Sequence, residues 1–121
     1  MTSLRVLIVE DEAIIALSME ALLGTLGHTV CATAATAGEA LDAAARERPD
    51  LAIMDIHLAD KTSGVEAAAA LFHGWGIRCL FISGNLDEDT RAALAPYSPL
   101  GFLNKPFLPS RFADAIRSLT L

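Results

Sequence analysis

The sequence predicts one α/β domain, a three-layer sandwich in which helices cover both faces of a central sheet of five parallel strands. Two observations predict it. Short apolar runs alternate with longer helical patterns along the 121 residues, and the main runs are apolar at every position. Such runs are typical of strands buried on both faces of a parallel sheet. A helix follows each strand, so the crossovers are expected to be right-handed.

Five segments are expected to form the strands. Three of them, residues 5–9, 51–54 and 79–82, are largely continuous apolar runs that end at polar residues. Two weaker candidates, residues 29–32 and 101–103, complete the sheet.

The first three helices are predicted by spacing and by stop signals. Residues 15–26 carry apolar side chains three and four positions apart, and Gly27 ends that helix. A capping box at residues 36–39 opens a second helix, which must end before Pro49. The Ala-rich segment 65–72 forms a third helix that stops near Gly74.

The last two helices differ in how strongly they are expected to pack. Three acids at residues 87–89 occupy the favourable positive end of a short helix that closes at Pro96. It has few large apolar residues, so we expect weak packing and an adjustable position. Pro109 begins the final helix, which carries Phe112, Ile116 and Leu119.

The charge balance excludes some classes of protein. Lys and Arg number 9 against 15 Asp and Glu, a net charge of −6. The basic residues form no cluster, so no nucleic-acid partner is expected. No segment approaches the roughly 18 apolar residues of a membrane span. The N-terminus also lacks the pattern of a signal peptide. We therefore expect a cytoplasmic protein without a membrane partner.

Polar side chains follow four of the five predicted strands. Glu10 and Asp11 come after the first strand, and Asp55 comes after the third. Ser83 follows the fourth strand and Lys105 the fifth. The carboxyl ends of parallel strands form one edge of the sheet, where open α/β sheets bind their ligands. The sequence therefore predicts that three carboxylates, a hydroxyl and an ammonium converge.

The charge of this cluster indicates its ligand. Three carboxylates and one lysine sum to −2, which one divalent cation would neutralise. Oxygen ligands favour a hard ion such as Mg²⁺. Without the ion, at least one carboxyl pKa should rise. A carboxylate nucleophile beside a metal ion and a lysine suits phosphoryl transfer.

These residues closely resemble the receiver domain of two-component response regulators, over essentially the whole chain. The resemblance rests on four motifs in order at strand ends: Val9-Glu10-Asp11-Glu12, Met54-Asp55-Ile56, Ile82-Ser83-Gly84 and Lys105-Pro106-Phe107. It implies the flavodoxin-like (βα)5 fold. It also implies that residues 1–121 are one receiver domain, with no output domain in this chain.

The resemblance assigns the acceptor and the metal ligands. Asp55 would accept a phosphoryl group from a phosphohistidine on a sensor histidine kinase or a histidine phosphotransfer protein. Asp11 and Asp55 would bind Mg²⁺ directly, with the backbone carbonyl of His57 as a third ligand and Glu10 acting through water.

The resemblance also assigns the residues that sense the phosphoryl group. Lys105 would pair with its oxygens, and Ser83 would donate a hydrogen bond to it. The Lys105–Pro106 bond would be cis. Phe102 occupies the aromatic switch position but lacks a tyrosine hydroxyl. The loop at residues 57–64 departs from the common pattern, because it is one residue longer and has no proline near Ala59.

The implied function is a phosphorylation-switched signalling module. It is not an enzyme, beyond self-catalysed phosphotransfer and autodephosphorylation. Movement of the Ser83 loop would shift the helix at residues 87–95. The face made by that helix, the last strand and the last helix is expected to bind a downstream protein or a second, phosphorylated copy. Phosphate relay, phosphate sink and effector binding remain open.

The alternatives fit the sequence less well. A small haloacid-dehalogenase-type phosphatase would also use an aspartyl-phosphate, but Asp55-Ile56-His57 lacks the second acid of its D-x-D pattern. A flavin or nucleotide module would need a glycine-rich loop after the first strand, where this chain has acids. A degenerate receiver that only binds partners conflicts with the complete set of site residues.

Overall fold

Strands and helices alternate along the computed structural model, which describes residues 3–58 and 63–119. The strands are β1 (Arg5–Val9), β2 (Thr29–Ala34), β3 (Leu51–Asp55), β4 (Arg78–Ser83) and β5 (Gly101–Asn104). The helices are α1 (Ala13–Thr25), α2 (Ala37–Glu47), α3 (Gly64–Trp75), α4 (Glu88–Leu94) and α5 (Pro109–Arg117), with a 3₁₀ turn at Ala95–Tyr97. The predicted α/β architecture is confirmed.

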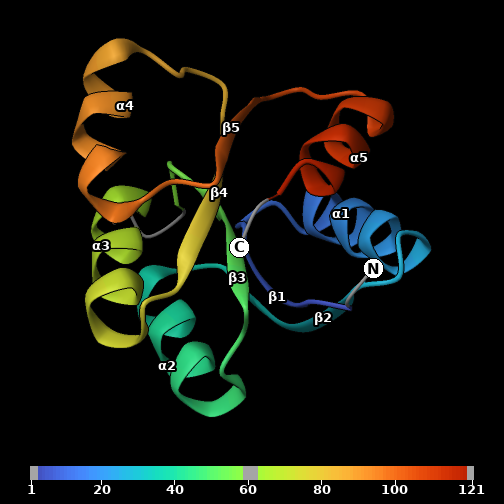
Figure 1. Ribbon diagram of the computed structural model, residues 1–121, viewed down its shortest axis with the longest axis horizontal. Coiled ribbons are helices and arrows are strands. Elements are labelled where there is room, and N and C mark those ends of the chain that lie inside the picture. Colours follow the sequence, from blue (N-terminus) through green and yellow to red (C-terminus); the bar gives the residue numbers. More distant parts are fainter. Residues whose placement is uncertain (1–2, 59–62, 120–121) are drawn as a thin grey trace.

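The strands form one parallel sheet in the order β2-β1-β3-β4-β5. The chain moves outward from β1 to β2 and then crosses back to the other side of β1 for β3. Helices α1 and α5 cover one face of the sheet, and α2, α3 and α4 cover the other (Figure 1). This reversal of direction between β1 and β3 creates a crevice at the carboxyl ends of the two strands.

Alternate residues of the inner strands supply two separate cores. In β1, Leu7 and Val9 pack toward α2, α3 and α4, whereas Val6 and Ile8 pack toward α1 and α5. All four side chains are almost fully buried. Since both faces of the inner strands are covered, their sequences are apolar at every position.

Helix termini follow the predicted capping chemistry. The Thr36 hydroxyl accepts a hydrogen bond from the Glu39 N–H at 3.1 Å, and the Glu39 carboxylate accepts one from the Ala35 N–H at 3.0 Å. The return bond of the capping box is therefore made one residue earlier than in its usual form. At α4, the Asp87 carboxylate accepts a hydrogen bond from the Thr90 N–H at 2.8 Å. Hydrogen bonding to the side chain of Thr90, and then to its backbone, lowers the pKa of Asp87.

Several predicted boundaries were wrong by a few residues. Strand β2 continues to Ala34, and β5 includes Asn104. The last residue of helix α3 is Trp75, one residue after Gly74. Its C-cap is Gly76, whose φ of 68° is the left-handed conformation that glycine adopts easily. Leu119 lies beyond the end of α5. The prediction for the loop at 57–64 falls partly outside the described residues, because 59–62 are not among them.

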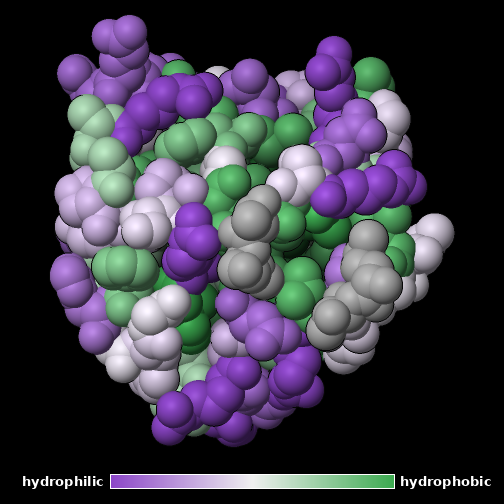
Figure 2. Space-filling view, in the orientation of Figure 1, coloured by the Kyte–Doolittle hydropathy of each residue, from purple (hydrophilic) through white to green (hydrophobic). Residues whose placement is uncertain are grey.

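The surface is predominantly hydrophilic around the outline of the face in Figure 2, with hydrophobic side chains visible nearer its middle. Among the described residues, three large apolar side chains are exposed, namely Ile14, Leu17 and Leu108. Within the described residues, every helix is too short or too polar to cross a membrane.

Candidate functional site

The carboxyl edge of the sheet brings together the side chains that the sequence places at strand ends. Glu10 follows β1, and Asp55 is the last residue of the neighbouring strand β3. Ser83 ends β4, and Lys105 follows β5. Glu10, Asp55 and Ser83 are all buried. Because the strands are parallel, these groups lie together at one edge of the sheet, next to the crevice between β1 and β3.

Asp55 is held by contacts to both of its carboxylate oxygens. Oδ1 accepts a hydrogen bond from the His57 N–H at 3.1 Å, and Oδ2 lies 3.3 Å from Nζ of Lys105. The Lys105–Pro106 peptide bond is cis, as the resemblance implies. The two contacts of the carboxylate fix the orientation of a side chain that is only 5% exposed.

Gly64 allows helix α3 to begin against the end of β3. Its N–H donates to the carbonyl of Ile56 at 2.8 Å. A Cβ at this position would collide with the backbone carbonyl oxygen of Asp55 and lie 2.7 Å from Cα of Ile56. Only glycine fits this approach, so the backbone on both sides of Asp55 depends on it.

Lys105 is the cation of the site and faces three carboxylates. Its Nζ lies 2.6 Å from Oε1 of Glu10, 3.3 Å from Oδ2 of Asp55 and 3.6 Å from Oε2 of Glu12. Burial lowers the pKa of Lys105, but the hydrogen bond to Glu10 and the charge of Asp55 together outweigh it, and the pKa is raised overall. The ammonium therefore remains protonated.

Glu10 has the most perturbed carboxyl group in the cluster. Burial and its hydrogen bond with Asp55 raise its pKa from 4.5 to about 7, although Lys105 opposes the shift. Its Oε1 is buried and, apart from the ion pair with Lys105, has no hydrogen-bond partner among the described residues. One lysine does not neutralise the acids gathered here, as the sequence-based charge count predicted.

The acidic cluster fits a hard divalent cation. Glu10, Asp11 and Asp55 each offer a carboxylate oxygen, and these oxygens lie within 4.8 Å of one another. Asp11 is exposed, whereas the other two are buried. An all-oxygen set with excess negative charge is the chemistry that Mg²⁺ prefers. The water-mediated role of Glu10 and the carbonyl ligand from His57 remain predictions.

Ser83 lies at the same edge, with its hydroxyl bonded inside its own loop. Oγ accepts a hydrogen bond from the Asn85 N–H at 3.0 Å and donates one to the Asn85 carbonyl at 3.3 Å. The Ser83 carbonyl accepts from the Lys105 N–H at 2.8 Å, which ties the ends of β4 and β5 together. To reach a new acceptor, the hydroxyl must give up its bond to Asn85.

Phe102, the predicted switch residue, is half-buried on β5. Its ring stacks on Phe81 with centroids 5.8 Å apart. The guanidinium of Arg91, from α4, lies 4.5 Å from the centroid of Phe102. This cation–π contact joins α4 to β5, and no pattern in the sequence indicates it.

Glu12 and Gly64 are the other residues whose role sequence reasoning missed. Glu12 belongs to the motif at residues 9–12, but the resemblance assigns no function to it. The run of three acids at residues 10–12 was the available signal. For Gly64, the signal was a glycine immediately before an Ala-rich helix, which does not by itself indicate contact with a distant strand.

Comparison with known proteins identifies the class to which this fold and site belong. The chain matches the family model of the response regulator receiver domain over residues 6–117. The phyllosphere-induced regulator PhyR of Methylorubrum extorquens is 37% identical over 113 residues, covering 93% of this chain and 42% of that protein. The chain therefore belongs to the family of response regulator receiver domains.

Two further similarities show the range of relatives. A protein-glutamate methylesterase/protein-glutamine glutaminase of Geobacter metallireducens is 36% identical over 90 residues, 74% of this chain and 26% of that protein. The chain thus spans less than half the length of either curated relative. The crystal structure of the signal receiver domain of a modulated diguanylate cyclase from Desulfovibrio desulfuricans matches with a TM-score of 0.85 and 32% identity. It covers 98% of this chain and 94% of that one.

Family membership confirms the predicted class of function. Receiver domains of two-component systems signal by phosphorylation, typically on an aspartate, and usually bind Mg²⁺ at an acidic pocket. The described residues of this chain contain such an acidic cluster. The comparisons give no support to the alternative of a haloacid-dehalogenase-type phosphatase.

Proposed function

We propose that Asp55 accepts a phosphoryl group from the phosphohistidine of a sensor histidine kinase or histidine phosphotransfer protein. The observation that carries the proposal is the buried Asp55 carboxylate, 3.3 Å from Lys105 and within 4.8 Å of the oxygens of Glu10 and Asp11. A nucleophile, a cation and a metal-type acidic cluster thus share one crevice.

The transfer follows from these positions. A carboxylate oxygen of Asp55 attacks phosphorus, the P–N bond to the donor histidine breaks, and the imidazole nitrogen keeps the bonding electron pair. Lys105 neutralises charge on the transferred oxygens. Bound Mg²⁺ would supply further charge stabilisation, held by Asp11 and Asp55, with Glu10 and the His57 carbonyl completing the set. Water later hydrolyses the acyl phosphate, so the chain modifies itself and turns over no separate substrate.

Phosphorylation would then alter a partner surface. Asp55 gains a group with more charge and three acceptor oxygens, which Ser83 can reach by exchanging its bond to Asn85. The loop after β4 leads directly into α4, where Leu94 is the buried residue. A helix so lightly anchored shifts at low cost, and Arg91 carries the shift to Phe102. We propose the α4-β5-α5 face as the surface for a downstream protein or a second phosphorylated copy.

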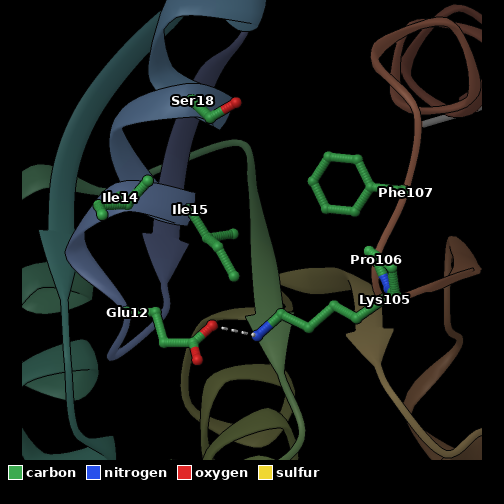
Figure 3. Close-up of a pocket in the computed structure, with 7 residues that line it drawn as sticks. All are labelled: Glu12, Ile14, Ile15, Ser18, Lys105, Pro106 and Phe107. Carbon is green, nitrogen blue, oxygen red and sulfur yellow. Dashed lines mark ion pairs between the residues drawn. The ribbon is translucent and has the colours of Figure 1, made fainter.

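The donor protein would dock beside the acceptor. A groove of about 420 Å³ opens next to Lys105, lined by Ile14 and Ile15 of α1 and by Pro106 and Phe107 (Figure 3). Ile14 is 83% exposed. We expect Ile14→Asp to slow transfer from a phosphoprotein several-fold while leaving labelling by a small phosphodonor unchanged, because only the protein donor uses this surface.

Intact mass analysis after incubation with Mg²⁺ and acetyl phosphate tests the central step. We expect one added phosphoryl group, stable in acid and removed by hydroxylamine, on the parent chain. Asp55→Asn should abolish it, whereas Asp42→Asn, a matched change at an exposed position on α2, should not. Full labelling of Asp55→Asn would refute the assignment, and turnover of many donor equivalents would favour a phosphatase.

A further inference from the structure

Glu12 makes a contact with the phosphoryl-transfer site that the proposed mechanism leaves unexplained. Its Oε2 lies 3.6 Å from Nζ of Lys105, and its side chain is 61% exposed. In Figure 3 the two side chains point toward one another from opposite sides of the groove, Glu12 from the start of α1 and Lys105 from the chain after β5.

Helix capping does not account for this side chain. Glu12 occupies the N-cap position of α1, but its side chain makes no capping hydrogen bond. Asn, Asp, Ser and Thr are the residues favoured at that position. The backbone of Glu12 is fixed independently, because its N–H donates to Oε2 of Glu10 at 3.4 Å. The backbone thus places the Glu12 side chain near the site, and the ion pair with Lys105 orients its carboxylate.

Glu12 differs from the other two carboxylates that Lys105 contacts. The side chains of Glu10 and Asp55 are 0% and 5% exposed, so both lie inside the site. Glu12 is the carboxylate on the solvent side of the ammonium. A donor that approached Lys105 from the solvent would therefore meet the negative charge of Glu12, which pairs with the ammonium that the phosphoryl oxygens would contact.

We infer that Glu12 is a specificity-determining residue that selects against small, highly charged phosphodonors through electrostatic repulsion. This inference rests on the proposed phosphorylation of Asp55. The more negative charge a donor brings close to Glu12, the more slowly that donor phosphorylates Asp55. A phosphohistidine presented by a protein is affected less, because the contacts of the protein interface offset the repulsion.

The test compares two donors of different charge. Near neutral pH, acetyl phosphate carries one more negative charge than phosphoramidate. Initial rates of labelling are measured by intact mass with saturating Mg²⁺ for the parent chain, Glu12→Gln and the control Asp42→Asn. In a water-exposed site, removing one charge at an assumed separation of about 8 Å should change the rate about twofold per unit of donor charge. Glu12→Gln should therefore accelerate labelling by acetyl phosphate about twofold more than labelling by phosphoramidate.

Salt dependence separates a charge effect from a structural one. Raising the ionic strength to about 1 M shortens the screening length to about 3 Å. The acceleration that Glu12→Gln causes with acetyl phosphate, divided by the acceleration with phosphoramidate, should therefore fall toward one. Asp42→Asn should leave the labelling rate with each donor equal to that of the parent chain at every salt concentration. Thermal unfolding of each variant checks that the fold is retained, and the isosteric glutamine is expected to be tolerated at an exposed position.

The outcomes distinguish this inference from the function on which it rests. If the parent and Glu12→Gln are labelled on Asp55, equal acceleration by both donors, slower labelling of the variant, or salt-independent acceleration overturns the inference alone. If neither chain is labelled by either donor, the proposed function fails and this inference fails with it.

Discussion

The raised pKa of Glu10 makes a prediction about stability that does not depend on any phosphodonor. On folding, the pKa of this carboxyl rises from 4.5 to about 7, because the side chain is buried and lies against Asp55. The folded chain therefore binds a proton at Glu10 more tightly than the unfolded chain does. The stability from that proton is fully present below about pH 4.5 and is lost as the pH rises through about 7.

Glu10→Gln isolates this contribution, since glutamine keeps the shape and cannot ionise. At about 1.4 kcal/mol for each tenfold change in proton affinity, ionising Glu10 in the folded chain costs at most about 3–4 kcal/mol. The exposed Glu12 shows that water reaches the edge of the cluster, so screening reduces the cost to about 1–3 kcal/mol. The variant should be more stable than the parent by this amount at pH 8, and nearly equal to it at pH 5.

The measurement is urea or thermal unfolding followed by circular dichroism, with a chelator present, at intervals from pH 5 to pH 8. For a domain of this size, 1 kcal/mol corresponds to roughly 3–5 °C in Tm. Taking the difference between the two chains removes the effects of all other titrating groups. A difference that is constant with pH, or a variant less stable than the parent at pH 8, would refute the reasoning.

Adding Mg²⁺ extends the same experiment. A ligand that binds only the folded chain stabilises it by about 2.7 kcal/mol at a concentration one hundred times its Kd. The parent should gain this stability at pH 8, and Glu10→Gln should gain less because the cluster has lost a charge. Equal stabilisation of both chains would exclude Glu10 from the ion's surroundings.

Three further substitutions, with one control, test individual contacts of the fold. Gly64→Ala should destabilise the fold by about 1–3 kcal/mol and slow phosphorylation, because the new Cβ meets the backbone of Asp55 and Ile56. Its control, Gly74→Ala, has open space around it and should stabilise α3 by about 0.5–1 kcal/mol in the same urea titration. Arg91→Met should remove the cation–π contact with Phe102, worth about 0.5–1 kcal/mol, and speed hydrogen exchange in α4 selectively. Thr36→Ala should cost about 1 kcal/mol in a thermal melt through loss of the N-cap, while leaving the labelling rate unchanged.

The predicted boundaries were accurate for the inner strands and less so at the edges, for a reason visible in the burial. Every residue of β3 is buried, so its apolar run marks nearly the whole strand. The edge strands β2 and β5 are mostly half-buried or exposed, and residues such as Thr33 and Asn104 interrupt the apolar pattern. Helix α3 ends at Trp75, next to the predicted stop near Gly74, and its C-cap is Gly76 in the left-handed conformation.

The architecture, and the set of residues that gather at the carboxyl edge of the sheet, could be predicted from the sequence. Buried parallel strands need apolar side chains at every position, and their carboxyl ends meet at one edge, so a list of strand-end residues is already a list of neighbours. Which side chains touch one another is visible only in the tertiary structure. Its three unpredicted contacts are the ion pair of Glu12 with Lys105, the close approach of Gly64 to Asp55 and the cation–π contact of Arg91 with Phe102. Each of these contacts joins residues from different elements, and its distance depends on how helices pack on the sheet, which no local pattern of residues encodes.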